Sequence, residues 1–278
     1  MSQRPDRLKI TAVQMISGPE LAPNLDTAAR LIAEAAAAGA QLVALPEYFP
    51  LIGASDNARL AAREVDGQGT VQTFLAEAAR RHGVWLVGGS IPLEANAANK
   101  VRNSCLIYDP QGERVARYDK IHLFSFTKDA ESYDESLTIE AGSDIVVVQL
   151  GGLGGLRVGL AICYDLRFPE LFRRMAQMPN PVDLLVVPAA FTETTGRAHW
   201  ELLLRARAVE NQCYVLAAAQ GGRHPTGRMT HGNSMVIDPW GEIIARMDKG
   251  EGIVSAELDP QQIVDIRSSL PALRHRIL

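Results

Sequence analysis

The second half of the sequence repeats the pattern of the first half, and this repeat limits the possible fold. Three pairs of segments match in order and character: KITAVQM at 9–15 with RVGLAIC at 157–163, QLVALPEYF at 41–49 with DLLVVPAAF at 183–191, and NSCLIYDPQGE at 103–113 with NSMVIDPWGE at 233–242. Each half reads as a β-α-β-α-β-β unit, and two such units can bury their bare sheet faces together. The repeat predicts an α/β fold: a four-layer α-β-β-α sandwich with an internal pseudo-two-fold duplication, in one domain over residues 1–278.

Local patterns place the elements of each unit. Short apolar runs predict strands over Lys9–Met15, Gln41–Pro46, Val84–Ile91, Leu156–Cys163, Asp183–Pro188 and Cys213–Ala219, and turn residues predict hairpins around 109–112 and 238–241. Apolar residues at helical spacing predict helices over Asn24–Ala38, Val71–His82, Pro169–Met178 and Arg197–Asn211. A polar loop is expected from Lys120 to Asp144.

Charge and cysteine content exclude several classes of protein. The 278 residues carry a net charge of −4, which gives no basic surface for nucleic acid or an anionic membrane. The most apolar span, 145–162, contains Gln149, Arg157 and a glycine-rich turn at 151–155, so it predicts two strands and not a membrane helix. The three cysteines form no disulfide framework, the histidines have no metal-ligand spacing, and the N-terminus lacks an apolar signal region. We therefore expect a cytoplasmic protein without a metal site.

Cys163 lies between a strand and a helix. It directly follows the apolar run Val158–Ile162, and a polar turn then leads to a helix start at 168–170. The N–H groups of a helix N-terminus favour a thiolate, and N–H groups after the cysteine can point at a developing oxyanion. The position suits a nucleophile, but it also suits a small buried cysteine at the end of a core strand.

The two halves differ at the positions of two potentially reactive residues. In the alignment Met15 stands opposite Cys163, and Ala189 stands opposite Glu47, which follows an apolar strand. A carboxylate at such a strand end is costly to bury unless it is paired or used. The asymmetry favours a functional role for Glu47 and Cys163, although sequence drift could also produce it.

A glutamate, a lysine and a cysteine together make a coherent hydrolytic site. Glu47 would take the thiol proton and later activate water, and Cys163 would attack a carbonyl or nitrile carbon. Lys120, which follows a predicted hairpin, would stabilise the negative oxygen with a backbone N–H near Tyr164.

These segments resemble the nitrilase superfamily of carbon–nitrogen hydrolases, which uses a Glu-Lys-Cys triad. LPEYF at 45–49, DKIHLF at 119–124 and GLAICYDLRFPE at 159–170 are similar to its three motifs in order and spacing. The resemblance implies the α-β-β-α fold, catalysis by Glu47, Lys120 and Cys163 without a metal or organic cofactor, and a homodimer or larger assembly. It also implies a further glutamate near the lysine, which maps to Glu135 in ESLTIEAG at 135–142, with Glu131 as a rival of poorer spacing.

Within the superfamily, residues 194–215, 217–224 and 233–241 resemble the Nit branch of deaminated glutathione amidases and ω-amidases. The resemblance implies a thiol amidase that cleaves a small carboxylated amide through an acyl-thioester and releases ammonia. Deaminated glutathione is the leading substrate and 2-oxoglutaramate is the second, ahead of a nitrile or an N-carbamoyl amino acid. The segment SFTKDA at 125–130 departs from the pattern of both groups, and it is expected to border the pocket.

A guanidinium suits bidentate capture of a substrate carboxylate. Arg167, four residues after Cys163, is the leading candidate. The other candidates for substrate binding each also fit a surface or packing role. They are the arginines Arg205, Arg207 and Arg223, together with Tyr164, Thr195 and His199.

Two alternatives remain at this point. His122 or His199 could serve as the base of a Cys-His hydrolase, although His199 at a predicted helix start also fits a packing role. The chain could also be a catalytically silent binding or scaffold protein with the same fold.

Overall fold

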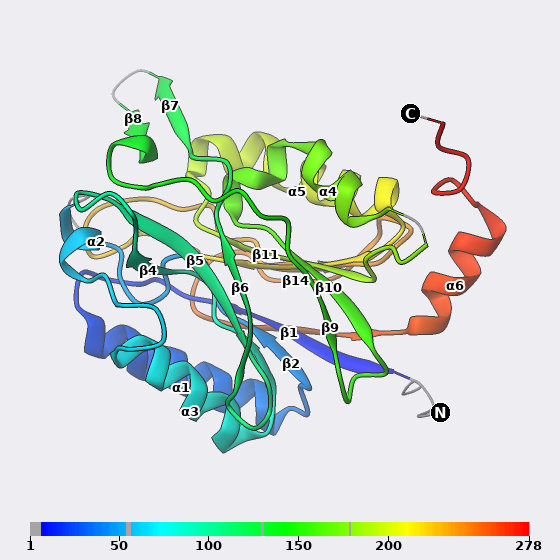
Figure 1. Ribbon diagram of the computed structural model, residues 1–278, viewed down its shortest axis with the longest axis horizontal. Helices are drawn as coiled ribbons and strands as arrows, with labels where there is room; N and C mark the ends of the chain where they lie inside the picture. The colour runs from blue at the N-terminus through cyan, green and yellow to red at the C-terminus, as the bar shows by residue number, and fades with distance from the viewer. Residues whose placement is uncertain (1–6, 54–56, 129–130, 178, 278) are drawn as a thin grey trace.

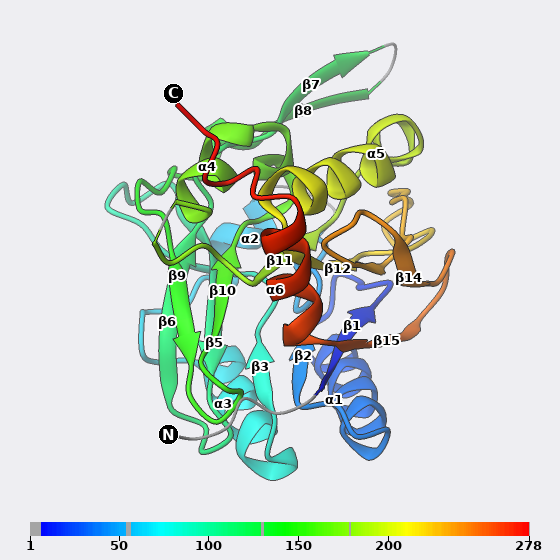
Figure 2. The same cartoon turned by 90° about the vertical axis from the view of Figure 1, so that its right-hand side faces the viewer.

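The computed structural model describes residues 7–53, 57–128, 131–177 and 179–277. Figures 1 and 2 show two sheets stacked face to face between two layers of helices, so the predicted four-layer α-β-β-α arrangement is confirmed. The first sheet has seven strands in the order β15-β1-β2-β3-β5-β4, with β6 paired to β5. Its strands are β1 (Leu8–Gln14), β2 (Leu42–Ala44), β3 (Trp85–Val87), β4 (Ile91–Glu94), β5 (Val101–Tyr108), β6 (Arg114–Asp119) and β15 (Gly252–Leu258).

The second sheet repeats this arrangement with six strands in the order β14-β13-β12-β11-β10-β9. Its strands are β9 (Val147–Leu150), β10 (Leu156–Leu160), β11 (Leu184–Ala189), β12 (Tyr214–Ala219), β13 (Met235–Ile237) and β14 (Ile243–Arg246). Strands β10, β11 and β12 run parallel, as β1, β2 and β3 do. An antiparallel strand flanks the first strand of each trio, β15 beside β1 and β9 beside β10.

Helices cover the outer face of each sheet (Figure 1). Helices α1 (Leu21–Ala37) and α3 (Thr70–His82) lie on the first sheet, and α4 (Pro169–Met175) and α5 (Glu193–Asn211) lie on the second. Two further helices are α2 (Asn57–Ala61) and α6 (Pro260–Ser269). No helix in the described ranges is both long and apolar enough to cross a membrane.

Side-chain alternation along the strands separates two cores. In β2, Leu42 and Ala44 face the second sheet, whereas Val43 faces the cluster beneath α1 and α3. Successive side chains of a strand point to opposite faces, so a strand covered on both sides is apolar at every position. This explains the continuous apolar runs that the repeat contains.

Several predicted boundaries were wrong. The predicted strand at 84–91 is broken into β3 and β4, because Gly89 has φ +58° and a Cβ there would lie 2.2 Å from the Pro46 carbonyl oxygen. Helix α5 begins at Glu193 and not at Arg197, because the Thr192 side chain accepts a hydrogen bond from the Thr195 N–H and caps an earlier start.

The predicted loop from Lys120 to Asp144 contains regular structure. Strands β7 (Ser125–Lys128) and β8 (Glu131–Asp134) pair as a hairpin, followed by a 3₁₀ turn at Glu135–Leu137. The hairpin projects from the body of the protein (Figure 2). The helix predicted over Pro169–Met178 corresponds to α4, which ends at Met175. Its predicted last residue, Met178, lies outside the described residues.

Candidate active site

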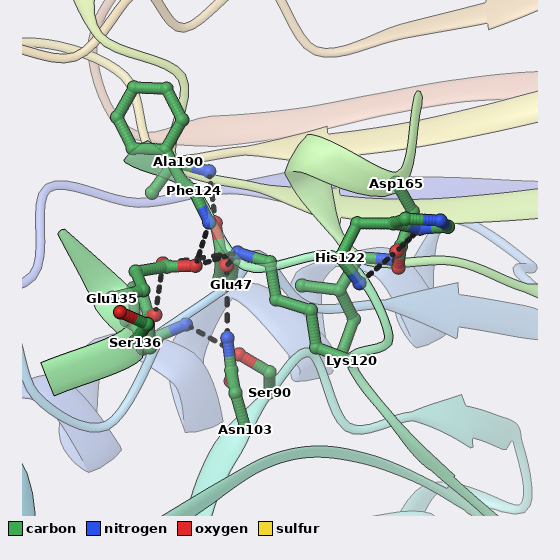
Figure 3. Close-up of polar contacts among 12 residues, drawn as sticks. Glu47, Ser90, Asn103, Lys120, His122, Phe124, Glu135, Ser136, Asp165 and Ala190 are labelled. Carbon is green, nitrogen blue, oxygen red and sulfur yellow. Dashed lines mark hydrogen bonds and ion pairs between the residues drawn. The ribbon is translucent and has the colours of Figure 1, made fainter. Parts of the chain in front are cut away.

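Three segments far apart in the sequence meet beside the ends of the two sheets. Glu47 follows β2, Lys120 follows β6 and Cys163 follows β10. Figure 3 shows the Lys120 ammonium between the carboxylates of Glu47 and Glu135. The structure therefore brings together the side chains that the sequence singled out.

Both carboxylate oxygens of Glu47 are held. Oε1 accepts hydrogen bonds from Asn103 Nδ2 at 3.0 Å and from Lys120 Nζ at 2.9 Å, and Oε2 accepts one from the Ala190 N–H at 2.9 Å. The side chain is 1% exposed and lies close enough to the Cys163 thiol to raise the pKa of that thiol. Buried carboxylates need such partners, and here the partners also fix the carboxylate beside the sulfur.

Lys120 is fully buried and forms ion pairs with two carboxylates. Its Nζ lies 2.9 Å from Glu47 Oε1 and 2.8 Å from Glu135 Oε2. Burial alone would lower the pKa of Lys120, but the charges of Glu135 and Glu47 outweigh it and raise that pKa well above its usual value. Lys120 is therefore a permanent cation, suited to stabilising a developing oxyanion.

Glu135 is held at the base of the hairpin. Its carboxylate accepts hydrogen bonds from the Tyr48 hydroxyl at 2.7 Å and the Phe124 N–H at 2.8 Å, in addition to Lys120. Burial would raise the pKa of Glu135, but the Lys120 charge prevails and lowers it. The rival Glu131 lies at the far end of β8.

Cys163 occupies a strained backbone turn. Its φ is +51°, in the left-handed region that non-glycine residues rarely adopt, and Tyr48, directly after Glu47, has φ +56°. Such strain persists where surrounding structure enforces it and is common at active sites. The thiolate expected from a helix N-terminus is wrong, because burial and the neighbouring Glu47 raise the pKa of the Cys163 thiol well above its usual value. The resting sulfur is therefore protonated and needs a base.

Asp165 joins the Cys163 turn to the Lys120 segment. Its fully buried carboxylate accepts hydrogen bonds from the Ile162 N–H at 2.8 Å, the Tyr118 hydroxyl at 2.6 Å and the His122 N–H at 3.0 Å. Ile162 precedes the cysteine, whereas Tyr118 and His122 flank the lysine. Figure 3 shows the contact of Asp165 with His122. One carboxylate thus ties the turn of the nucleophile to the segment of the lysine.

The two histidines considered as bases lie elsewhere. His122 Nδ1 lies 2.7 Å from Asp165 Oδ1, and the ring stacks on Phe168. His199 Nδ1 lies 3.2 Å from Arg167 Nη1, and because α5 starts early this histidine is in the second turn of the helix, not at its start. Neither ring lines the described pocket at Cys163, so the geometry favours Glu47 as the base.

A pocket opens over the sulfur. It is lined by the predicted residues Glu47, Glu135, Cys163, Tyr164, Arg167 and Thr195, and by Phe124, Ala190, Phe191, Thr192 and Arg228. Lys120 does not line the pocket but pairs with Glu47, which does. His199 likewise does not line the pocket but contacts Arg167, which does. Sequence reasoning missed Arg228, which lies in no motif and reaches the pocket from a distant loop.

Three other predicted carboxylate-binding arginines do not line the pocket, so those candidates were wrong. Arg207 donates to the Leu166 carbonyl and pairs with Glu210, and Arg205 donates to the Gly241 carbonyl. Arg223 is exposed at an isolated antiparallel bridge with Met229. Within the described ranges, no group of three or more His, Cys, Asp or Glu side chains could hold a metal ion.

Comparison with known proteins decides the family. The sequence profile of carbon-nitrogen hydrolases matches residues 9–268. The chain belongs to the carbon–nitrogen hydrolase family. It is 42% identical to a deaminated glutathione amidase of Synechocystis over 96% of this chain and 97% of that protein, and 38% identical to omega-amidase NIT2-A of Xenopus laevis over 97% and 95%.

A solved structure agrees with this assignment. Nit3 of Saccharomyces cerevisiae, a member of branch 10 of the nitrilase superfamily, superposes with a TM-score of 0.87 at 31% identity, covering 98% of this chain and 97% of that one. The resemblance to the Nit branch of the nitrilase superfamily is confirmed. This carbon–nitrogen hydrolase is an amidase that acts on non-peptide carbon–nitrogen bonds, and not a silent scaffold.

Proposed function

We propose that this amidase hydrolyses a small carboxylated amide through an acyl-thioester on Cys163, with deaminated glutathione as its leading substrate. The observation that carries the proposal is the clamped Glu47 carboxylate beside a protonated thiol, with a buried cation on its other side. The similarity to deaminated glutathione amidases supports the choice of substrate.

The mechanism follows from the contacts. Glu47 takes the Cys163 proton as the sulfur attacks the amide carbon, and Lys120 with the Tyr164 N–H stabilises the oxyanion. Glu47 then gives the proton to the departing nitrogen, and the C–N bond breaks. Glu47 next removes a proton from water, which attacks the thioester and releases the acid and the free thiol. Glu135 positions Lys120 and the substrate amide.

The leaving group depends on the substrate. A primary amide such as 2-oxoglutaramate releases ammonia, as expected from the sequence. Deaminated glutathione carries a secondary amide, so its hydrolysis releases cysteinylglycine instead. Both reactions give 2-oxoglutarate, which is therefore the product to measure. On the acyl side, we assign the substrate carboxylate to Arg167, oriented by His199, with Tyr164 and Thr195 lining the same wall.

A substrate panel tests this function. Release of 2-oxoglutarate from deaminated glutathione and from 2-oxoglutaramate is compared with hydrolysis of an N-carbamoyl amino acid and a simple nitrile. We expect the highest kcat/KM with deaminated glutathione and the next highest with 2-oxoglutaramate. Turnover of the nitrile or carbamoyl compound alone would contradict the proposal, and a higher kcat/KM for 2-oxoglutaramate would favour an ω-amidase.

We further propose that the chain acts as one domain, works in the reducing cytoplasm and forms a homodimer. Three free cysteines suit a reducing compartment. The outer face of α5 carries Leu202 at 67% exposure and Val209 at 51%, and Trp240 on the adjoining β13–β14 turn is 58% exposed. Arg197, Glu201 and Arg205 lie along the same face, so side chains of both charges are available to a two-fold contact of this face with itself.

Replacing Leu202 by Asp is expected to dissociate this dimer. A charge in the centre of an apolar contact is left desolvated and unpaired, which costs several kcal/mol. Size-exclusion chromatography with light scattering should give twice the 30.2 kDa chain mass for the wild type and the single chain mass for the variant. A wild-type mass of one chain, or an unchanged dimer in the variant, would contradict this interface.

A further inference from the structure

Arg228 reaches the pocket from outside the three motifs. It lies in the segment between β12 and β13, and its side chain lines the pocket together with Arg167. Its guanidinium stands over the ring of Tyr133, with Cζ 5.5 Å from the ring centroid, and Tyr133 in turn packs on Phe124 at the pocket wall. Arg228 is therefore part of the pocket wall and does not point into solvent.

The loop that carries Arg228 is held in place. The His224 N–H donates to the Arg228 carbonyl at 2.9 Å, and the Gly227 N–H donates back to the His224 carbonyl at 2.8 Å, which forms a tight turn. The buried His224 ring bonds to the Ser17 carbonyl through Nδ1 and to the Thr230 hydroxyl through Nε2, both at 2.8 Å. Burial lowers the pKa of His224. A neutral imidazole then anchors the turn and fixes the Arg228 backbone.

The charge of Arg228 has no carboxylate partner among the described residues. Its Nε is buried without a hydrogen-bond acceptor, and Nη2 makes only a long 3.5 Å contact with the Ala190 carbonyl. An unsatisfied buried donor is costly, and a guanidinium normally meets such a cost by pairing with an anion. Lys120 already pairs with two carboxylates and does not line the pocket, so the cations on the pocket wall that a substrate carboxylate can reach are Arg167 and Arg228.

Arg228 is connected to Glu47 through one residue, Ala190. It contacts the carbonyl of Ala190, whose N–H holds Glu47 Oε2. Glu47 must be near the departing nitrogen, because it protonates that nitrogen. Arg167 instead follows the nucleophile on its own turn and packs on Tyr164. Arg228 is thus tied to the residue that holds the general base, and Arg167 to the turn of the nucleophile.

We propose that Arg228 binds a carboxylate on the leaving-group side of the substrate, so that the enzyme prefers amides with an anion on each side of the cleaved bond. This inference rests on the proposed amidase function. It separates the two leading substrates by their chemistry. Deaminated glutathione carries a glycine carboxylate on its leaving group, whereas the ammonia released from 2-oxoglutaramate has none.

The test compares deaminated glutathione with its C-terminal carboxamide, which keeps the scissile bond and the acyl-side carboxylate. Charge-assisted hydrogen bonds of this kind are worth roughly 10- to 100-fold in affinity. We expect wild-type kcat/KM to be at least about 10-fold higher for the free acid, mostly through KM. In Arg228→Gln the ratio should approach one, and Arg228→Lys should keep part of it.

The matched control is Arg223→Gln, which removes an exposed arginine side chain from the residue just before the same turn and should leave the ratio at its wild-type value. If the wild type used the free acid and the carboxamide with similar kcat/KM, the inference would be overturned. This result needs only the wild type, so it holds even if the Arg228→Gln variant is inactive. An unchanged ratio in a folded, active Arg228→Gln variant would also overturn it. Failure of the wild type on both compounds and on 2-oxoglutaramate would instead refute the proposed function.

Discussion

Replacing Glu47 by Gln is expected to reduce kcat by about 10²- to 10⁴-fold and at the same time to make Cys163 more acidic. The base that takes the thiol proton and delivers it to the leaving group is lost. Burial raises the pKa of the Cys163 thiol, and the Glu47 charge and hydrogen bond raise it further, whereas Lys120 lowers it. Without the carboxylate, the burial effect and the lysine remain, so the thiol pKa falls. More thiolate should then accompany less turnover.

Two measurements separate these effects. Turnover is followed by 2-oxoglutarate release, and the thiolate is followed by the pH profile of iodoacetamide alkylation at Cys163, located by peptide mass. The alkylation midpoint should lie at lower pH in Glu47→Gln than in the wild type. Glu20→Gln, which changes an exposed glutamate before α1, should shift neither measurement. A midpoint that stays constant or rises, or turnover that survives, would contradict the assignment of Glu47 as base.

The fold could be predicted because the repeat and the strand pattern are both local in the sequence. A strand covered on both faces is apolar at every position, and such runs stand at matching places in both halves. The repeat also showed that Met15 takes the place of Cys163 and that Ala189 takes the place of Glu47. The bridge between Met15 and Gln220, and the Ala190 N–H bound to Glu47, show that each half contacts the other at the places where the reactive residue of one half faces its unreactive counterpart.

The parts that could not be predicted depend on contacts between distant segments. Strand β15 pairs with β1 across some 240 positions of sequence, and no local sequence pattern predicts this pairing. The break at Gly89 reflects the approach of the Pro46 backbone, and the thiol pKa reflects burial that only the folded state creates. The role of Arg228 could not be predicted either, because an arginine on the surface and an arginine that lines a pocket look the same in the sequence.

Replacing Lys120 by Met should destabilise the protein by about 3–5 kcal/mol at pH 8, because it leaves the Glu47 and Glu135 carboxylates buried without their cation. Loss of the oxyanion cation should also lower kcat by about 10²- to 10³-fold. The pH dependence of stability should change sign. In the wild type the lowered pKa of Glu135 contributes stability that is present above the unfolded carboxyl pKa of about 4.3 and is lost as pH falls through the folded value. In the variant, only the hydrogen bonds from the Phe124 N–H and the Tyr48 hydroxyl oppose burial, which is the largest influence on this carboxyl. We therefore expect its pKa to rise above the unfolded value, so that protonation on folding stabilises the variant at low pH.

Urea unfolding at pH 8, 6.5 and 5 measures this change, with the free energy of unfolding extrapolated to water. The deficit of Lys120→Met relative to the wild type should be largest at pH 8 and shrink toward pH 5. The double variant Lys120→Met/Glu135→Gln removes one of the two stranded charges, so it should regain stability at pH 8 and show less dependence on pH. Simple loss of side-chain packing would give the same deficit at every pH and no recovery in the double variant. That result would contradict the electrostatic role of Lys120 as the cation that holds two carboxylates around the thiol.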